Sequence, residues 1–458
     1  MRPGQPITVT CTDLDDEGAG VGESAGHAVH VAGALPGERV TAVVEHVSRR
    51  SPVAWARLAH VEAPSPARRP AACRAFGACG GCVLQELDYP VQLEWKRARV
   101  ARAIAAQPVL RGLGVGVCVA SPRPLGYRNK SKLVAARASG RFVLGAFAPR
   151  SHDVVDLAGC RIAEPPLDDV AEALRAILDD AGVRPYDERT LTGDLRHVIL
   201  RVNADGQVLA ALVVARPLAD GPALAARLRA ARPEVIGVVE HVNQTRGNAI
   251  FAEGGSAERV LSGAGELVDR VDVDGRRVRL PLSASAFFQA NRDVAGLAYA
   301  AIARALAVRP GERVADAYSG VGGIALALAP GAGEVVGIES HAAATARATT
   351  AAARNGAANA RFVTADAAAG LAALDRADVV VLNPPRKGCD AAVLAEVARL
   401  APRAVAYLSC DPDTLARDLA ALAARGYRTR AVTPFDMLPH TPHVEALAIL
   451  ERAPAHTA

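Results

Sequence analysis

The sequence predicts an α/β protein whose C-terminal part is a doubly wound sheet, preceded by a small β-barrel and a central α+β region. Three observations support this fold class. Short alternating strands separated by glycine turns fill residues 7–60, hairpin turns mix with helices from about 140 to 281, and apolar strands alternate with alanine-rich helices from about 285 onward. The expected domains are residues 1–62, 63–282 and 283–458.

The N-terminal pattern is typical of a small closed barrel. Apolar residues alternate with polar neighbours, and glycine-rich or Pro-Gly turns at residues 18–22 and 35–37 separate the alternating runs. Spacing of this kind favours a barrel of oligonucleotide-binding type, and a barrel that only packs against the rest of the chain is equally consistent with it. The alternating positions are Ile7, Val9, Val29, Val31, Val40, Ala42 and Val44.

A basic segment follows a proline-rich linker at residues 63–70. Residues 90–150 hold 12 Lys and Arg residues against one acid, Glu94, although the net charge of the 458-residue chain is only +5. Residues 91–106 read as an amphipathic helix, and residues 90–125 are expected to pack on the C-terminal domain. The local excess of positive charge indicates either a solvated face or a surface that binds a polyanion.

Two Asp-Gly turns predict hairpins in the central region, at Asp205-Gly206 and Asp274-Gly275, and a helix is expected at residues 171–181. In the C-terminal region five apolar segments read as strands. In a doubly wound sheet the carboxyl ends of such strands meet at the edge where ligands bind. The expected strands are residues 313–316, 334–339, 378–383, 404–409 and 444–450.

A glycine-rich turn, D-A-Y-S-G-V-G-G at residues 316–323, follows the first of these strands and opens a helix. Backbone N–H groups and the helix dipole are therefore available to a ligand. Glu339 ends the next strand, 19 residues after Gly320, where a carboxylate can bind a ribose hydroxyl. Nicotinamide and S-adenosylmethionine (SAM) binders share this arrangement, and a turn that merely connects a strand to a helix looks the same.

The next ligand-facing strand ends in N-P-P-R at residues 383–386. Two consecutive prolines make a rigid, extended segment. Adenine-N6 methyltransferases carry a similar Asn-Pro-Pro followed by an aromatic residue, whereas Arg386 stands at that position here. The sequence therefore contains no aromatic clamp for a flipped adenine.

Cys410 lies where an apolar strand meets a helix. Asp411 is the expected N-cap and Pro412 the first helical residue, so the positive end of the helix at residues 413–425 is expected near the sulfur. A helix N-terminus lowers the pKa of a thiol, while the neighbouring acidic residues oppose this effect; a buried structural cysteine is the alternative. Glu445, on the last expected strand, is costly to bury without a task, although a Glu at a strand end is commonly without function.

The stretch C-R-A-F-G-A-C-G-G-C places Cys73, Cys79 and Cys82 at C-x5-C-x2-C spacing. Two thiolates separated by two residues can reach one metal centre, and Cys160 is the best candidate for a fourth ligand. Zinc and a cluster of iron and sulfide both take four thiolates. The spacing alone does not choose between them.

Together these residues resemble the RNA uracil-C5 (5-methyluridine) methyltransferase family, in particular its iron–sulfur branch, which includes the bacterial 23S rRNA enzymes. The resemblance spans nearly the whole chain and includes a TRAM-like N-terminal barrel. Its most specific blocks are L-S-C-D-P-D-T-L-A-R-D-L at 408–419 and D-M-L-P-H-T-P-H-V-E at 436–445. Further matching blocks are G-Y-R-N-K at 126–130, S-A-F-F-Q-A-N at 285–291, D-A-Y-S-G-V-G at 316–322 and N-P-P-R-K-G at 383–388.

The resemblance implies a SAM-dependent enzyme that methylates carbon 5 of a uridine in RNA, with 23S rRNA as the expected target and tRNA as the alternative. Cys410 is the implied nucleophile that adds to carbon 6, and Glu445 is the implied base that removes the carbon-5 proton. The implied SAM contacts are Gln289, Tyr318, Gly323, Glu339, Asp366 and Asn383. The implied ligands of a 4Fe-4S cluster are Cys73, Cys79, Cys82 and Cys160. The expected phosphate contacts are Arg128, Lys130 and Lys132.

Ser319, Gly323 and Asn383 depart from the commonest family pattern, and all three concern the SAM contacts. Two other functions are alternatives to methylation: an RNA-binding or ribosome-assembly protein without turnover, and a nicotinamide oxidoreductase. The presence of both Cys410 and Glu445 argues against the first. The N-P-P-R and S-C-D-P blocks have no place in the mechanism of the second.

The bulk composition is that of an ordinary soluble globular protein. Half of the residues are hydrophobic and 22% are charged. No stretch reads as a membrane span, and the N-terminus M-R-P-G-Q-P lacks the apolar core of a signal peptide. We therefore expect a cytoplasmic monomer with no membrane partner.

Overall fold

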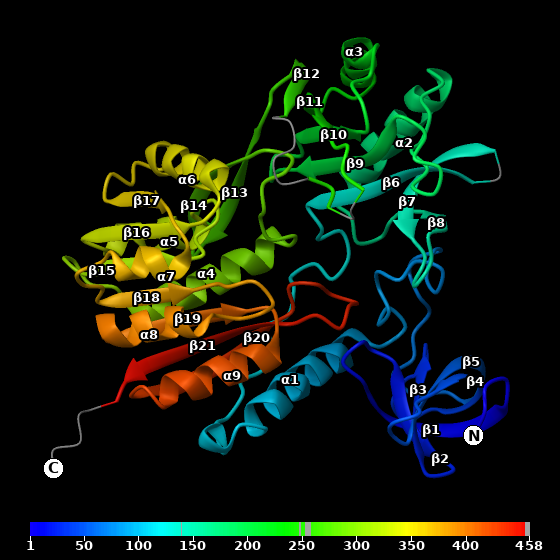
Figure 1. Ribbon diagram of the computed structural model, residues 1–458, viewed down its shortest axis with the longest axis horizontal. Coiled ribbons are helices and arrows are strands. Elements are labelled where there is room, and N and C mark those ends of the chain that lie inside the picture. The colour runs from blue at the N-terminus through cyan, green and yellow to red at the C-terminus, as the bar shows by residue number, and fades with distance from the viewer. Residues whose placement is uncertain (139, 247–248, 252–257, 454–458) are drawn as a thin grey trace.

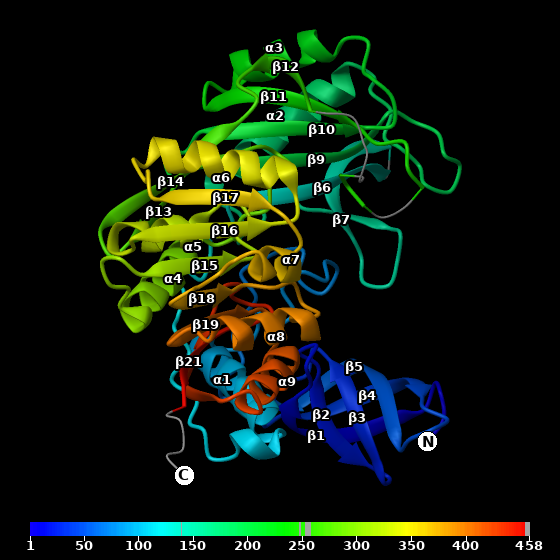
Figure 2. The same ribbon diagram turned by 60° about the vertical axis from the view of Figure 1, so that its left-hand side comes forward.

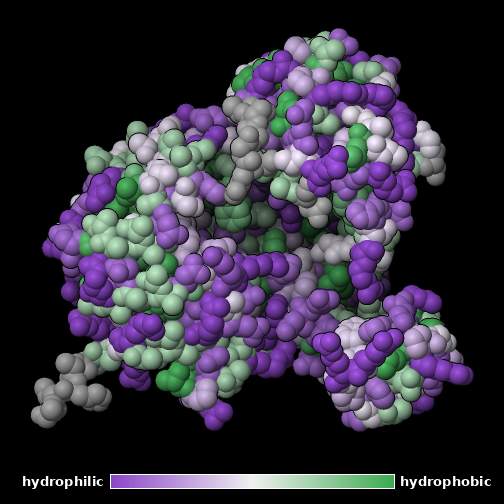
Figure 3. Space-filling view, viewed as in Figure 1, coloured by the Kyte–Doolittle hydropathy of each residue, from purple (hydrophilic) through white to green (hydrophobic). Residues whose placement is uncertain are grey.

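The computed structural model describes residues 1–138, 140–246, 249–251 and 258–453, and the chain forms three parts that follow one another in sequence (Figure 1). A small barrel comes first, a sheet with helices on one face comes second, and a second sheet with helices on both faces comes third (Figures 1 and 2). In the space-filling view a hollow opens between the three parts (Figure 3).

The N-terminal barrel closes from five strands in the order β1-β2-β3-β5-β4, as the alternating pattern predicts. Alternate residues face inward, and most of the predicted inward positions, among them Val9, Val29 and Val40, form its core. The strands are β1 (Pro6–Leu14), β2 (Gly20–Ser24), β3 (His27–Ala32), β4 (Arg39–Val47) and β5 (Val53–Ala63).

The central sheet has seven strands in the order β12-β11-β10-β9-β6-β7-β8. Helices α2 (Pro165–Asp180) and α3 (Gly221–Ala231) cover one face, and the other face packs partly against the third part of the chain. The predicted turn at Asp205-Gly206 joins β9 to β10. The strands are β6 (Lys130–Ala138), β7 (Arg141–Phe147), β8 (Val154–Asp156), β9 (Leu195–Val202), β10 (Val208–Val214), β11 (Val235–Val242) and β12 (Arg259–Gly263).

The C-terminal sheet has seven strands in the order β17-β16-β15-β18-β19-β21-β20, and β21 runs antiparallel to both of its neighbours. All five expected strands occur, and β17 and β20 are additional. The strands are β15 (Arg313–Ala317), β16 (Glu334–Glu339), β17 (Ala360–Thr364), β18 (Val379–Leu382), β19 (Ala404–Ser409), β20 (Tyr427–Phe435) and β21 (Glu445–Arg452).

Helices cover both faces of this sheet (Figure 2). One face carries α4 (Arg292–Leu306), α5 (Gly323–Leu328) and α6 (Ala342–Arg354), and the other carries α7 (Ala367–Ala372), α8 (Ala391–Leu400) and α9 (Pro412–Ala423). Helix α1 (Tyr89–Ala105) also belongs to this second face, where it packs against α9 and β20. Short 3-10 turns occur at Pro108–Leu110 and Ala329–Gly331. Within the described residues no helix has the length and apolar character needed to cross a membrane.

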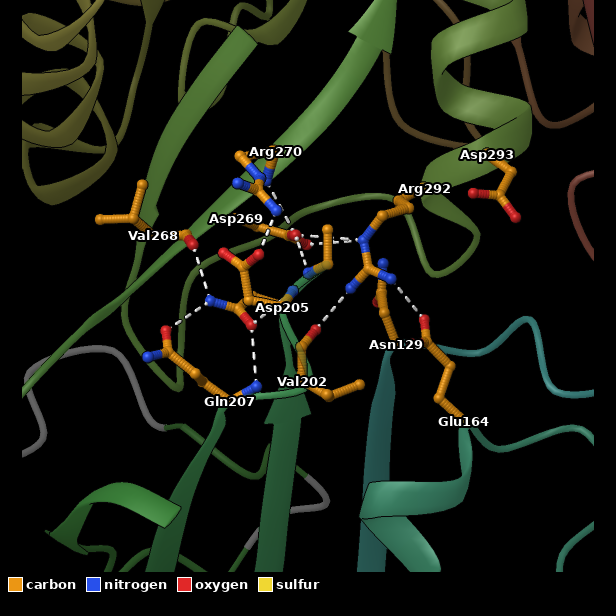
Figure 4. A network of polar contacts seen from close by, with 12 residues as sticks. Asn129, Glu164, Val202, Asp205, Gln207, Val268, Asp269, Arg270, Arg292 and Asp293 are labelled. Atoms are coloured by element: carbon orange, nitrogen blue, oxygen red, sulfur yellow. Dashed lines mark hydrogen bonds and ion pairs between the residues drawn. The ribbon is translucent and has the colours of Figure 1, made fainter. Parts of the chain in front are cut away.

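A hairpin and a buried ion network join the central and C-terminal sheets. The hairpin is formed by β13 (Leu267–Val273) and β14 (Arg276–Leu282) around the predicted Asp274-Gly275 turn. The Arg292 guanidinium, at the start of α4, contacts the carboxylates of Glu164 at 2.6 Å and Asp269 at 3.1 Å, and it donates to the Val202 carbonyl at 2.6 Å (Figure 4). One side chain therefore ties α4 to the start of α2, the end of β9 and the hairpin.

Candidate active site

Cys410 and Glu445 occupy facing positions on adjacent strands. Cys410 follows the last residue of β19, and Glu445 begins β21, which pairs with β19 so that Ser409 lies opposite Ala446. The pairing stops there, but its continuation by one residue directs Cys410 toward Glu445, and the carboxylate is close enough to act electrostatically on the thiol. Glu445 is buried and Cys410 is partly exposed, so the thiol is the accessible member of the pair.

Burial raises the pKa of both Glu445 and Cys410. Burial raises the pKa of Glu445 to about 8, and the nearby Arg386 guanidinium acts in the opposite direction. Burial, followed by the Glu445 carboxylate, raises the pKa of Cys410 to about 11, and Arg386 again opposes this. Asp411 does cap α9, because its Oδ1 accepts the Thr414 N–H at 2.9 Å. Of the two opposing influences expected at this thiol, those that raise its pKa prevail, because burial and the Glu445 carboxylate outweigh Arg386.

Arg386 is a site residue whose role the sequence analysis missed. It follows the two prolines after β18, and its carbonyl oxygen accepts a hydrogen bond from Thr414 Oγ1 at 3.0 Å, which ties this loop to α9. Its Nη2 lies 3.3 Å from His443 Nδ1. The departure from an aromatic residue at this position was the available signal, and the structure places a positive charge beside both Cys410 and Glu445.

The glycine-rich loop after β15 turns sharply at the ligand-binding edge. Tyr318, Gly320 and Gly322 have φ angles of 63°, 56° and 86°, in the left-handed region that favours glycine. At Gly322 a Cβ atom would come within 2.7 Å of the Phe362 ring, so no larger residue fits there. Glu339, at the end of β16, accepts the Gly320 N–H at 3.0 Å and is thereby fixed against the loop.

The remaining predicted SAM residues reach this edge from other elements. Asp366 caps α7, where its Oδ1 accepts the Ala368 N–H at 2.9 Å, and Asn383 directly follows β18. Because β15 to β18 are parallel, their carboxyl ends meet at the same edge. Gln289 comes from the segment before α4; it is buried, and its carbonyl oxygen accepts a hydrogen bond from Asn129 Nδ2 at 2.9 Å.

Two buried polar atoms at this edge have no hydrogen-bond partner among the described residues, namely Asp316 Oδ1 and Ser319 Oγ. Burial also raises the pKa of Asp316 to about 7. Unsatisfied polar atoms are uncommon in protein interiors and fit a site that receives a polar ligand. The residues present therefore suit a nucleoside-containing group such as SAM.

Tyr299, on α4, is a second residue that the sequence analysis did not single out. Its hydroxyl oxygen lies 3.0 Å from the position that a Cβ on Gly323 would occupy. Burial, followed by Asp316 and Glu445, raises its pKa. Tyr299 therefore fills the space between the glycine-rich loop and the Glu445 side of the site, which explains why glycine stands at position 323.

The four predicted metal-ligating cysteines come from two segments and lie within electrostatic range of Cys82. Burial, followed by Cys160, Cys79 and Cys73, raises the pKa of Cys82 to about 12, so the four thiols are electrostatic neighbours. Arg74 donates two hydrogen bonds to the Ala158 carbonyl, at 3.0 and 2.6 Å, and so ties the first segment to the second. No three His, Cys, Asp or Glu side chains in the described part of the chain are arranged to hold a single metal ion.

The expectation that Lys130 contacts phosphate is wrong. Its Nζ donates to the carbonyl oxygens of Ala284 at 2.8 Å and Ala286 at 3.3 Å, and burial lowers its pKa to about 6. An uncharged, buried amine cannot attract a phosphate at neutral pH. Lys132, two residues further along β6, is exposed, and Arg128 is partly exposed.

A sheet of this order, with a glycine-rich loop after β15 and an acid after β16, defines an α/β methyltransferase fold. Comparison with known proteins agrees: the chain is 39% identical over 456 residues to an RNA methyltransferase of Geobacter sulfurreducens, covering 98% of this chain and 90% of the relative. It is 35% identical to an RNA methyltransferase of Halalkalibacterium halodurans, covering 97% and 96%.

The tRNA (Uracil-5-)-methyltransferase family model matches residues 249–453. The crystal structure of Pyrococcus abyssi tRNA (uracil-54, C5)-methyltransferase in complex with S-adenosyl-L-homocysteine superimposes with a TM-score of 0.76 at 25% identity, covering 97% of this chain and 100% of that one. The chain therefore belongs to the SAM-dependent RNA uracil-5-methyltransferase family.

Proposed function

We propose that this chain transfers a methyl group from SAM to carbon 5 of a uridine in RNA, through a covalent bond between Cys410 and carbon 6 of the base. The observation that carries the proposal is the proximity of Cys410, directly after β19, to Glu445 at the start of β21, beside Arg386. Family membership supplies the reaction class.

The proposed chemistry assigns one step to each group. The Cys410 thiolate adds to carbon 6, so that carbon 5 gains the negative character of an enolate. Carbon 5 then bonds to the methyl group of SAM as the S–CH3 bond breaks and S-adenosyl-L-homocysteine leaves. Glu445 then removes the carbon-5 proton; the electron pair of that C–H bond restores the C5=C6 double bond, and the C6–S bond breaks to release the thiolate. Arg386 favours the charged form of both residues.

The donor pocket is proposed to use the residues at the carboxyl edge of the sheet. Glu339, fixed by the Gly320 N–H, suits a pair of ribose hydroxyls, and Asp366 and Asn383 lie after the neighbouring strands. Tyr318, Gly323 and Gln289 complete the proposed set. The unpartnered oxygens of Asp316 and Ser319 supply further polar contacts.

We propose that RNA binds to the barrel and the exposed part of the basic segment. Trp55 on β5 is 39% exposed; its ring stacks on His30 at 5.7 Å and lies 5.5 Å from His46. Aromatic side chains presented in this way stack on unpaired bases, and a uridine must leave a helix or come from a loop to reach Cys410. Lys132 is the favoured phosphate contact.

The proposed target is 23S rRNA, and tRNA is the second candidate. The first rests on the resemblance of the four cysteines to the iron–sulfur branch. The second is favoured by the P. abyssi neighbour, whose name specifies uracil-54 of tRNA. Mapping 5-methyluridine in both RNA classes from a strain that lacks the gene distinguishes them.

We propose that Cys73, Cys79, Cys82 and Cys160 hold a 4Fe-4S cluster. Their mutual proximity suits a set of ligands to one centre. Burial raises the pKa of both Cys82 and Cys160, and the nearby Arg128 charge opposes this rise. The cluster would cross-link the segment before α1 to the loop before α2. Anaerobic purification should give a brown protein whose broad visible absorbance is lost in Cys82→Ser; a colourless protein with one bound zinc would overturn the assignment.

Two substitutions test the reaction. Cys410→Ala should abolish methylation, because no thiolate is available to activate the ring. Glu445→Gln should methylate once and then remain joined to the RNA, because the carbon-5 proton stays in place, and the adduct should appear on a denaturing gel with labelled SAM. Glu451→Gln, an exposed position on the same strand, is the matched control. Full turnover by Cys410→Ala would refute the mechanism.

A further inference from the structure

The loop that presents Glu445 is held by the N-terminal third of the chain. Residues 436–444 join β20 to β21, and carbonyl oxygens along this loop accept hydrogen bonds from donors between residues 84 and 127. The pairs are Lys96 Nζ with Leu438 at 3.0 Å, Tyr127 Oη with Pro439 at 3.1 Å, Leu84 N with His440 at 3.0 Å and Arg99 Nη1 with Pro442 at 2.9 Å. Lys96 also forms an ion pair with Asp436, and neither side chain is exposed.

Gln92 lies at the centre of these contacts. Its side chain is fully buried on α1, and its Nε2 donates to the carbonyl oxygens of Leu84 at 3.1 Å and Leu87 at 2.7 Å. Its Oε1 accepts the His440 N–H at 3.0 Å, and its Nε2 lies 3.1 Å from His440 Nδ1. One amide therefore binds the segment that follows Cys82 and the loop that precedes Glu445 at the same time.

His440 needs this support because of its backbone conformation. Its φ angle is 65°, in the left-handed region that a residue with a Cβ rarely adopts. Such a conformation persists where the surrounding structure holds it in place. Here Gln92 holds the N–H of His440 and the Leu84 N–H holds its carbonyl oxygen. Loss of the Gln92 amide would let the main chain relax a few residues before Glu445.

We infer that Gln92 is a positioning residue for Glu445: it holds the His440 main chain in the conformation that brings the carboxylate opposite Cys410. The inference rests on the proposed function, because it concerns the proton-removal step. SAM binding and the addition of sulfur to carbon 6 involve other groups, so Gln92 affects neither of them. The defect expected from its loss is therefore a delay after methyl transfer.

Gln92→Leu tests this inference, because leucine keeps most of the volume and removes every polar contact of the amide. The substrate is RNA with tritium at carbon 5 of its uridines, and the measurement is tritium release together with the amount of covalent protein–RNA adduct. We expect tritium release to fall about 10- to 100-fold, the range expected for a misplaced catalytic group, while methylated adduct accumulates as it does in Glu445→Gln. The dissociation constant for SAM should stay within about twofold of the wild-type value.

Tyr127→Phe provides a second variant that changes a single atom. It removes only the hydroxyl that donates to Pro439, and it should accumulate adduct to a level between those of the wild type and Gln92→Leu. Glu94→Gln, an exposed position on the same helix, is the control and should behave as the wild type.

The outcomes separate this inference from the function on which it rests. Glu445→Gln could form the adduct while Gln92→Leu and Tyr127→Phe both release tritium at the wild-type rate. That result would overturn the role of Gln92 but leave the proposed reaction intact. Loss of SAM binding and of adduct together in Gln92→Leu, with wild-type behaviour in Tyr127→Phe, would show general damage and also overturn it. Absence of adduct in Glu445→Gln itself would refute the proposed reaction.

Discussion

A carboxyl group with a pKa of about 8 is mostly protonated at neutral pH, and Glu445 is such a group in the free protein. Its proposed task requires the ionised form. Arg386 is the group that favours ionisation here, and the partly exposed Cys410 faces the same charge. Turnover limited by proton removal should therefore increase as the pH rises toward 8.

The same buried carboxyl group predicts how stability depends on pH. In the unfolded chain Glu445 ionises near its ordinary pKa of 4.5, but in the folded chain it ionises near 8. Between these values the folded state binds more protons, so the free energy of unfolding falls as the pH rises. In Glu445→Gln the free energy of unfolding does not fall with pH for this reason, because glutamine does not ionise. Relative to the wild type, the variant should gain a few kcal/mol in urea unfolding between pH 5 and pH 9.

Glu451→Gln provides the baseline for this measurement, because Glu451 is exposed on the same strand. Its unfolding free energy should follow that of the wild type at every pH. Parallel pH curves for the wild type and Glu445→Gln would contradict the burial of an ionisable group at position 445.

At the scale of single elements, the segment between β14 and α4 depends on the central sheet. Lys130 and Arg201 donate to the carbonyl of Ala286, Lys130 also donates to that of Ala284, and Asn129 donates to that of Gln289. This segment carries the proposed SAM contact Gln289. A substitution in β6 should therefore change the affinity for SAM, although β6 belongs to the central sheet.

Lys130→Met tests this connection. Methionine matches the length of lysine but leaves the Ala284 carbonyl oxygen without the lysine donor, whereas the Ala286 oxygen keeps Arg201. An unpaired buried carbonyl costs about 1–3 kcal/mol. SAM affinity, measured by calorimetry, should fall several-fold. An unchanged SAM affinity would show that the segment holds its conformation without Lys130.

The two strands of the C-terminal sheet that the sequence failed to predict share one property. Strands β16 and β19 occupy the expected residues, because both are continuous apolar runs buried in the sheet. β17 and β20 lie at the two edges of the same sheet, and exposed residues interrupt them. An edge strand has water on one side and needs no continuous apolar run, so the pattern that identifies interior strands is absent from it.

The site was predictable where the chemistry depends on residue type and strand position. Cys410 and Glu445 follow from β19 and β21, and the glycine loop and Glu339 follow from β15 and β16. The raised pKa of Cys410 and the burial of Lys130 were not predictable, because the groups that cause them are distant in the sequence. Glu445 acts on the thiol from another strand, and the carbonyls that bind Lys130 lie more than 150 residues further along the chain.

At the scale of the whole molecule, RNA binding should depend on charges that face solvent. Lys130 and Lys132 form a matched pair, because they lie two residues apart on β6 and differ in burial. Lys132→Gln should weaken RNA binding and reduce the slope of log affinity against log salt concentration by about one unit. Lys130→Met should leave that slope unchanged. Equal effects of the two substitutions on the slope would contradict the burial of Lys130.

The position of β21 has a consequence for protein synthesis. It follows the other strands of its sheet in the chain, yet it lies in the interior of that sheet, between β19 and β20, and it begins with Glu445. Domains generally fold as they are made, so the barrel and the central sheet can form first. Glu445, the proposed proton acceptor, is therefore made after every other strand of this sheet. A nascent chain that has not yet reached β21 lacks the proposed reaction centre while it is surrounded by RNA, and a chain cut before this strand should lack proton removal altogether.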